Sequence, residues 1–340
     1  MKRLSVLALP FLFVFVLSGA AFAAGPSEIF IKAGVETRYI AAGETVNNIS
    51  FDCAGCGGRV ASELEFPLEN NFFTGVNFEL ATFFDGDRVN KPEAKLSITY
   101  LQAIGGPKGT MRDSDRIQVD TDPPYSQVAL SGGKDLFTKS DDELVAGTMF
   151  DVNFVYNFKI NEQVTIGPVF GYMFQKFKHD VRGGDGTYWG VPVSLMNATQ
   201  IDFENESNIP YLGVNSEVFF GEGDKSSISL GLLYSGWVGA TYLDIHRYPD
   251  TDTPGADIDR HFIGDLDGEA YIARLNTDWY LSEKWFLGAG GEYLVIKTDG
   301  KQKQREYTNG ALTGVSTGKI NTALDTTMLS VNLRLGYAFF

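Results

Sequence analysis

The sequence predicts an all-β protein, a ten-stranded antiparallel transmembrane β-barrel with long extracellular extensions. Segments of about ten residues alternate between apolar and polar side chains, as in strands that face lipid on one side and a polar interior on the other. Short and long connections alternate between these segments, which is also typical of such barrels. The mean hydropathy is −0.09 although 13% of the residues are aromatic. This is expected when the hydropathy of an apolar strand face and that of the opposite polar face cancel in the average.

The last segment, residues 328–340, shows the alternation most clearly. Its apolar face consists of Leu329, Val331, Leu333, Leu335, Tyr337 and Phe339. Similar patterns occur in residues 149–158, 164–174, 228–234 and 271–281. A soluble β-sandwich is the alternative, but its inward faces would have to be apolar, whereas nearly every segment here has a polar face.

The connections predict the number of strands. Short turns are expected near residues 85–93, 157–163, 221–225 and 282–284, and long loops at about 41–57, 107–146, 181–201, 244–261 and 300–318. Four short turns and five long loops imply ten strands. Because the strands are longer than about ten residues, we expect the barrel to project beyond the membrane.

The N-terminus has the features of a secretory signal peptide. Lys2 and Arg3 precede a short apolar run, and small residues follow up to Ala23. The run is short for a membrane-spanning helix of about 20 residues. We therefore expect residues 1–23 to be a signal peptide and residues 24–340 to form one outer-membrane barrel domain.

The charge of the chain limits its partners. The formal net charge is −15, and removing Lys2 and Arg3 with the signal peptide makes it −17. This balance disfavours nucleic acid as a partner. It suits cationic peptides or proteins, although solvated acidic surface loops would give the same charge. We expect outer-membrane lipid as the surroundings and a monomer as the functional unit.

The two cysteines, Cys53 and Cys56, lie in the first expected surface loop. In an oxidising compartment they would form a local disulfide, or the pair is incidental. A redox motif is the alternative, but the thioredoxin-like context is missing.

Two pairs of polar residues could carry chemistry. Asp113 and Asp115 lie two apart, and adjacent carboxylates can hold one proton at a raised pKa. Asp244 and His246 are also two apart, and an Asp beside a His can orient the imidazole as a base. Each pair alone would also be explained by a solvated surface loop.

Taken together with their context, the pairs resemble the omptin family of outer-membrane aspartyl proteases. The similar segments are GRVASELEF, GTMRDSD, MFDVNF, VRGG, IPYLG and YSGWV, and an Asp-x-His follows the last of them. The resemblance covers about residues 27–300. It implies an endopeptidase at the cell surface, with its active site facing outward, acting on peptides or proteins near basic residues.

The resemblance also implies the role of each residue. Asp113, Asp115, Asp244 and His246 form the catalytic set, with a water between Asp113 and His246. His246 acts as general base, Asp244 orients it, and Asp115 supports Asp113. No Ser or Cys nucleophile and no metal ion is needed, because the water attacks the peptide carbonyl directly.

Two further sites are implied with departures from the family pattern. Glu36 matches an acid that receives the basic side chain before the cleaved bond, but Tyr242 stands where the family has a second acid. This departure puts strict preference for Arg or Lys in doubt. Lipopolysaccharide is implied as an activator that binds at Tyr172 and Lys176, yet Phe174 replaces the acidic member of that motif.

The strand pattern conflicts with the proposed site at one place. Strict alternation from Tyr234 puts Asp244 and His246 on the lipid-facing side, so catalysis requires a β-bulge or an irregular strand end between Tyr234 and Asp244. Three alternatives remain on sequence alone. They are a catalytically silent adhesin, a passive pore, and a metal-dependent hydrolase in which three Asp and one His hold a cation.

Overall fold

The computed structural model describes residues 28–53, 58–83, 94–119, 126–127, 136–188, 191–194, 200–221, 226–249, 257–315 and 320–339. The expected signal peptide, residues 1–23, lies outside these ranges. So do Cys56 and the side chain of Cys53, and with them the expected disulfide. Within the described ranges, no helix has the length and apolar character needed to cross a membrane.

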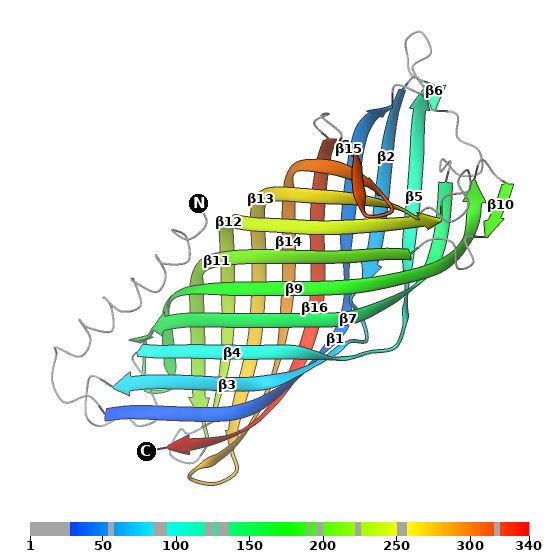
Figure 1. Ribbon diagram of the computed structural model, residues 1–340. Helices are drawn as coiled ribbons and strands as arrows, with labels where there is room; N and C mark the ends of the chain where they lie inside the picture. The colour runs from blue at the N-terminus through cyan, green and yellow to red at the C-terminus, as the bar shows by residue number, and fades with distance from the viewer. Residues whose placement is uncertain are drawn as a thin grey trace.

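Antiparallel strands close into a ring with ten positions among the described residues, as the sequence predicts (Figure 1). The long strands are β1 (Glu28–Cys53), β2 (Gly58–Pro67), β3 (Phe72–Phe83), β4 (Ala94–Gly105), β5 (Gly109–Val119), β7 (Leu136–Tyr156), β9 (Val164–Tyr188), β11 (Gln200–Phe220), β12 (Ser226–Pro249), β13 (Asp257–Tyr280), β14 (Trp285–Thr308) and β16 (Ile320–Phe339). Short strands are β6 (Ser126–Gln127), β8 (Phe158–Lys159), β10 (Val191–Ser194) and β15 (Ala311–Val315).

Two positions of the ring are each formed by two consecutive strands. β3 and β4 pair with each other in the lower wall, while β2 and β5 pair with each other above them. β1 pairs with both β2 and β3, and β7 pairs with both β4 and β5. Figure 1 shows β2 and β5 rising past the ends of β3 and β4, so the barrel is tall.

A belt of apolar side chains covers the outside of the lower wall. In β16 five of the six expected outer residues are exposed, with Leu333 at 62%, and Tyr337 is half-buried. Ser330 and Asn332 on the opposite face are buried, which confirms the predicted alternation. Tyr234 and Tyr271 stand side by side at the upper edge of this belt, like the aromatic girdle of a membrane protein. Lipid is the medium that such a belt suits.

Above the belt the outer face is polar. One row that crosses five neighbouring strands contains Lys176, Glu206, Thr241, Asp265 and Lys301. Four charges in one row would be costly in hydrocarbon. The strands therefore continue into water, and the prediction that the barrel projects beyond the membrane is confirmed.

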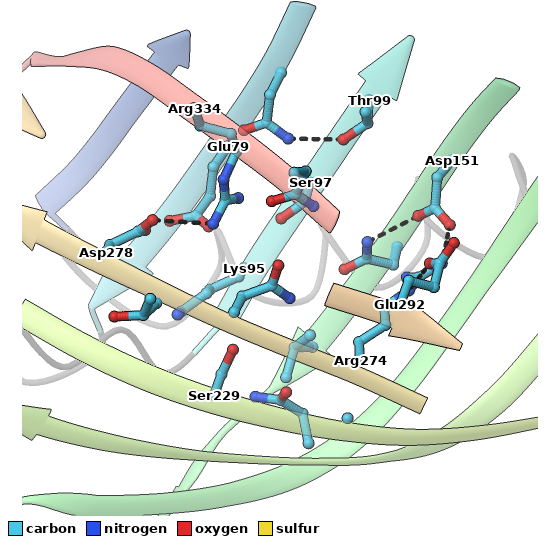
Figure 2. Close-up of a pocket in the computed structure, with 18 of the residues that line it drawn as sticks. Glu79, Lys95, Ser97, Thr99, Asp151, Ser229, Arg274, Asp278, Glu292 and Arg334 are labelled. Atoms are coloured by element: carbon cyan, nitrogen blue, oxygen red, sulfur yellow. Dashed lines mark hydrogen bonds and ion pairs between the residues drawn. The ribbon is translucent and has the colours of Figure 1, made fainter. Parts of the chain in front are cut away.

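Ion pairs fill the inside of the membrane-spanning part (Figure 2). Arg274 lies 2.5 Å from Asp151 and 2.6 Å from Glu292, and Glu292 also holds Arg38 at 3.0 Å. Further pairs join Lys32 to Glu79 and Asp278, Arg334 to Asp278, and Lys95 to Glu217. Only about 140 Å³ of free volume remains among these side chains.

A layer of apolar side chains closes the barrel above these ion pairs. The ring of Phe66 from β2 stacks on that of Phe203 from β11, with centroids 4.0 Å apart. β2 and β11 are not neighbours in the sheet, so this contact crosses the interior. Leu64, Met111, Val181, Ile201, Leu266 and Leu324 pack in the same cluster. The layer thus fills the barrel interior at the level of β2, above the ion pairs of the membrane part.

Two expected loops were predicted too long, because the strands extend into them. β5 runs to Val119 inside the expected loop 107–146, and β12 runs to Pro249 inside the expected loop 244–261. Above the membrane both faces of a strand carry polar residues, so the alternation that predicts a strand disappears there. The residues singled out for chemistry consequently lie on strands.

Candidate active site

A β-bulge in β12 turns Asp244 and His246 toward the interior. Ser235 pairs with Ala270 and Val238 pairs with Gly268. Between these two register pairs β12 advances by three residues and β13 by two, so β12 contains one extra residue. The extra residue reverses the alternation, and Trp237 is left on the outside with 65% exposure. Tyr242 and Asp244 are both buried as a result. The bulge that catalysis required is therefore present.

Asp113 and Asp115 face the interior from the opposite wall. On β5 they pair with Leu64 and Ser62 of β2, and directly paired residues of antiparallel strands point to the same side. Leu64 is fully buried in the apolar layer, which fixes the inward direction for Asp113. The Asp113–Asp115 pair thus lies on the inner face and begins at the level of the apolar layer.

The stacked rings bring the two walls together at this level. Phe203 is the register partner of Asp244, and Phe66 lies two residues from Leu64, the partner of Asp113. In keeping with this short span, the charges of Asp115, His246 and Asp244 all act on Asp113. The four residues expected to form one site do lie together, at one level of the barrel interior.

Asp244 and His246 form a tight pair. The Nε2 atom of His246 lies 3.0 Å from Oδ1 and 3.1 Å from Oδ2 of Asp244. Asp244 is completely buried, while 13% of the His246 side chain is exposed. The imidazole also contacts the ring of Phe262 edge-on, at 5.1 Å between centroids. His246 is therefore held in one orientation with one edge open to the site.

Asp113 has an unusual proton affinity. Burial and the neighbouring charge of Asp115 raise its pKa to about 7, although the charge of His246 opposes this. Its buried Oδ1 accepts no hydrogen bond from the residues that the structure describes. A carboxyl in this state can exchange a proton, or accept a hydrogen bond from a ligand, near neutral pH.

We expect Asp113→Asn to stabilise the barrel at alkaline pH. Because the pKa of Asp113 is raised from 3.8 to about 7 on folding, the folded state binds more protons between these values and loses stability as the pH rises through them. Asn removes this loss, which is at most about 1.4 kcal/mol for each pH step of one between the two pKa values. Urea unfolding at pH 4 and pH 8 should show the gain only at pH 8. Equal stability of the two proteins at pH 8 would contradict the raised pKa.

The structure does not bring Glu36 to this site, and the expected pocket of Glu36 and Tyr242 needs correction. Glu36 lies in the membrane part, paired with Arg38 at 3.0 Å. Tyr242 contacts Thr322, whose register partner on β1 is Ile49, thirteen residues further along the strand. At about 3.3 Å per residue this is a separation of about 43 Å along β1.

Tyr172 and Lys176 lie on the outer face of β9, as a lipid-contacting pair requires. The Tyr172 hydroxyl donates to Asn208 at 2.5 Å. The Lys176 ammonium lies 2.7 Å from Glu204, and its register partner on β11 is Glu206. Two acids thus surround the one cation of the implied lipopolysaccharide site.

Sequence reasoning missed two buried groups near the site. His179 lies 2.9 Å from Asp142 and packs beside the stacked rings of Phe66 and Phe203. The second group surrounds Tyr242: its hydroxyl contacts Gln302 and Thr322, and Thr322 donates a hydrogen bond to Asn47. Their partners are far apart in the chain, and only the inward position of each residue on its strand could have pointed to them. Among the described residues, no three His, Cys, Asp or Glu side chains are placed to hold a metal ion.

The fold and the site define a membrane-spanning β-barrel with two facing pairs of polar residues at its water-exposed end. One is the Asp113–Asp115 pair and the other is the Asp244–His246 pair. The profile of the Omptin family matches residues 57–339. The chain therefore belongs to the Omptin family.

Solved structures agree on the fold. The chain is similar to the outer membrane protease OmpT from Escherichia coli, with a TM-score of 0.68 and 17% identity over 91% of this chain and 97% of that one. The outer membrane protein OprG from Pseudomonas aeruginosa is 10% identical over 93% and 97% of the two chains, but its TM-score of 0.28 is too low to bear on the fold. No curated protein matches the chain.

Proposed function

We propose that the chain is an outer-membrane endopeptidase that hydrolyses peptides or proteins at the cell surface. The observation that carries the proposal is that the Asp244–His246 pair lies close enough to Asp113 for their charges to interact, with the charge of Asp115 also acting on Asp113. Membership of the Omptin family and the fold shared with a protease support it. The mature chain is strongly acidic, which favours cationic peptides as substrates through long-range attraction.

In the proposed mechanism a water molecule lies between Asp113 and His246. Nε2 of His246 faces Asp244, so Nδ1 takes one proton from the water as its oxygen attacks the carbonyl carbon. Asp244 orients the imidazole and stabilises the imidazolium that forms. Asp113 accepts a hydrogen bond from the same water. The tetrahedral adduct then collapses, the C–N bond breaks, and His246 returns the proton to the leaving nitrogen.

The decisive experiment is digestion of a random peptide library by refolded wild type and His246→Ala side by side. Wild type should cut peptides internally and His246→Ala should leave the library intact. Full activity of the variant would contradict the mechanism. Persistence of wild-type cleavage in chelator would exclude a metal-dependent hydrolase.

The interior favours a closed barrel over a pore. Since ion pairs and the apolar layer fill it, wild type in a planar bilayer should give no stepwise ion conductance. Steady single-channel currents would instead support the pore. An adhesin predicts partner binding that is unchanged when all four catalytic residues are replaced.

Lipopolysaccharide enters the proposal as an activator. Since Lys176 is already paired with Glu204, activity should be compared in vesicles with and without lipopolysaccharide. Lys176→Ala should remove any stimulation that wild type shows.

A further inference from the structure

Four buried polar side chains without formal charge lie beside the Asp244–His246 pair, called the catalytic pair below. They come from the inner faces of β1, β12, β14 and β16, and each is at most 4% exposed. This neutral cluster consists of Asn47, Tyr242, Gln302 and Thr322. Tyr242 precedes Asp244 by two residues on the same face of β12, so the cluster lies directly beside the Asp244–His246 pair.

Hydrogen bonds hold the cluster together. The Tyr242 hydroxyl donates to the Gln302 side-chain oxygen and lies 2.8 Å from Oγ1 of Thr322. Thr322 in turn donates to Oδ1 of Asn47 at 3.0 Å. The ring of Tyr242 covers the backbone of its register partner Gly264, where a Cβ would come within 2.1 Å of the ring. The aromatic side chain therefore fills the space over Gly264 and leaves little room there for a long side chain.

The cluster also lacks a counterion for a cation. Burial raises the pKa of Tyr242, so its hydroxyl stays protonated and uncharged at neutral pH. The nearby carboxylate of Asp244 is already bound to His246. Nδ2 of Asn47 is a buried donor without a partner among the described residues, and a donor repels a guanidinium or ammonium group. A charge buried without a partner is strongly unfavourable, whereas an uncharged side chain avoids that cost.

We propose that the neutral cluster determines specificity, and that it selects an uncharged side chain over Arg or Lys at the residue before the cleaved bond. The inference rests on the proposed peptidase function. Tyr242 is its main determinant, because its ring fills the space over Gly264 and its hydroxyl carries no charge. Cationic peptides would still be attracted by the overall charge of the barrel, while the residue held beside the catalytic pair is neutral.

The test compares kcat/KM for matched peptides that carry Arg, Lys, Gln or Ala before the cleaved bond. Wild type should cleave the Gln and Ala peptides at least about tenfold faster than the Arg and Lys peptides, the factor that corresponds to about 1.4 kcal/mol. Cleavage of the Arg peptide as fast as the Gln peptide, or faster, would overturn the inference. Absence of cleavage of all four would overturn the peptidase function itself.

Variants separate charge from shape. Tyr242→Asp combined with Asn47→Glu removes the ring and supplies two acids, so the Arg peptide should become the better substrate. Tyr242→Phe keeps the ring without charge and should keep the wild-type ranking. Heat-modifiable mobility on gels reports whether each variant folds. If the acidic variant does not fold, the order of kcat/KM values in wild type still tests the inference. A reversed ranking in Tyr242→Phe would contradict it.

Discussion

Replacing His246 by alanine is expected to lower kcat/KM by about 10² to 10⁴-fold, the range that general-base catalysis contributes. The imidazole is the one histidine of the described site, and Asp244 holds it by a contact of 3.0 Å. Without it the attacking water has to give its proton to bulk solvent or to Asp113. Asp244→Asn should also lose activity, because an amide cannot stabilise the imidazolium charge. Initial rates on one fluorogenic peptide measure both effects.

His261 provides the matched control for this prediction. It lies on β13, the neighbouring strand, but its register partner is Ile245, so it points to the outer face. Its ring packs on Tyr307 at 4.5 Å between centroids. His261→Ala should therefore leave kcat/KM within a factor of two or so, since surface changes of this kind are usually small. Equal losses in the two variants would show that the effect of His246→Ala comes from disturbed folding.

The membrane part of the barrel was predictable from sequence because lipid imposes a strict alternation. Leu329, Val331 and Leu333 face outward because each second residue of β16 meets hydrocarbon, and this period appears in the sequence itself. The extracellular part has no such constraint. Glu206 and Asp265 stand on its outer face, and polar residues such as Asp113 and Asp244 interrupt the apolar residues of its inner face, so the strict alternation is lost there.

The four candidate residues could be picked out from the sequence, but their placement in the barrel could not. Asp113, Asp115, Asp244 and His246 form pairs two residues apart, which is the spacing that shares a strand face. The inward direction of Asp244 and His246 depends on one extra residue near Trp237, and the pairing of β12 with β13 shows where this residue lies. The distance of Glu36 from the site was not predictable, because a short motif does not determine where a residue lies along a strand of 26 residues. The neutral cluster depends on the register of four strands.

Replacing Arg274 by methionine is expected to destabilise the barrel by about 3–5 kcal/mol, the cost of removing one partner from a buried ion pair. Arg274 contacts Asp151 at 2.5 Å and Glu292 at 2.6 Å, and it donates to the Tyr211 hydroxyl at 3.0 Å. Glu292 would keep Arg38, whereas Asp151 would lose the cation that lies against it. Urea unfolding in lipid vesicles, followed by tryptophan fluorescence, measures the loss.

Two comparisons identify the cause of that loss. Arg112 and Glu65 form a pair at 3.0 Å, but Arg112 is 54% exposed, so Arg112→Met should cost at most about 1 kcal/mol. Adding Asp151→Asn to Arg274→Met removes the buried charge that lost its partner. Because removing both partners of an interaction costs less than leaving one unsatisfied, the double variant should recover part of the stability. A double variant less stable than Arg274→Met would show that lost packing of the arginine stem, rather than unpaired charge, accounts for the effect.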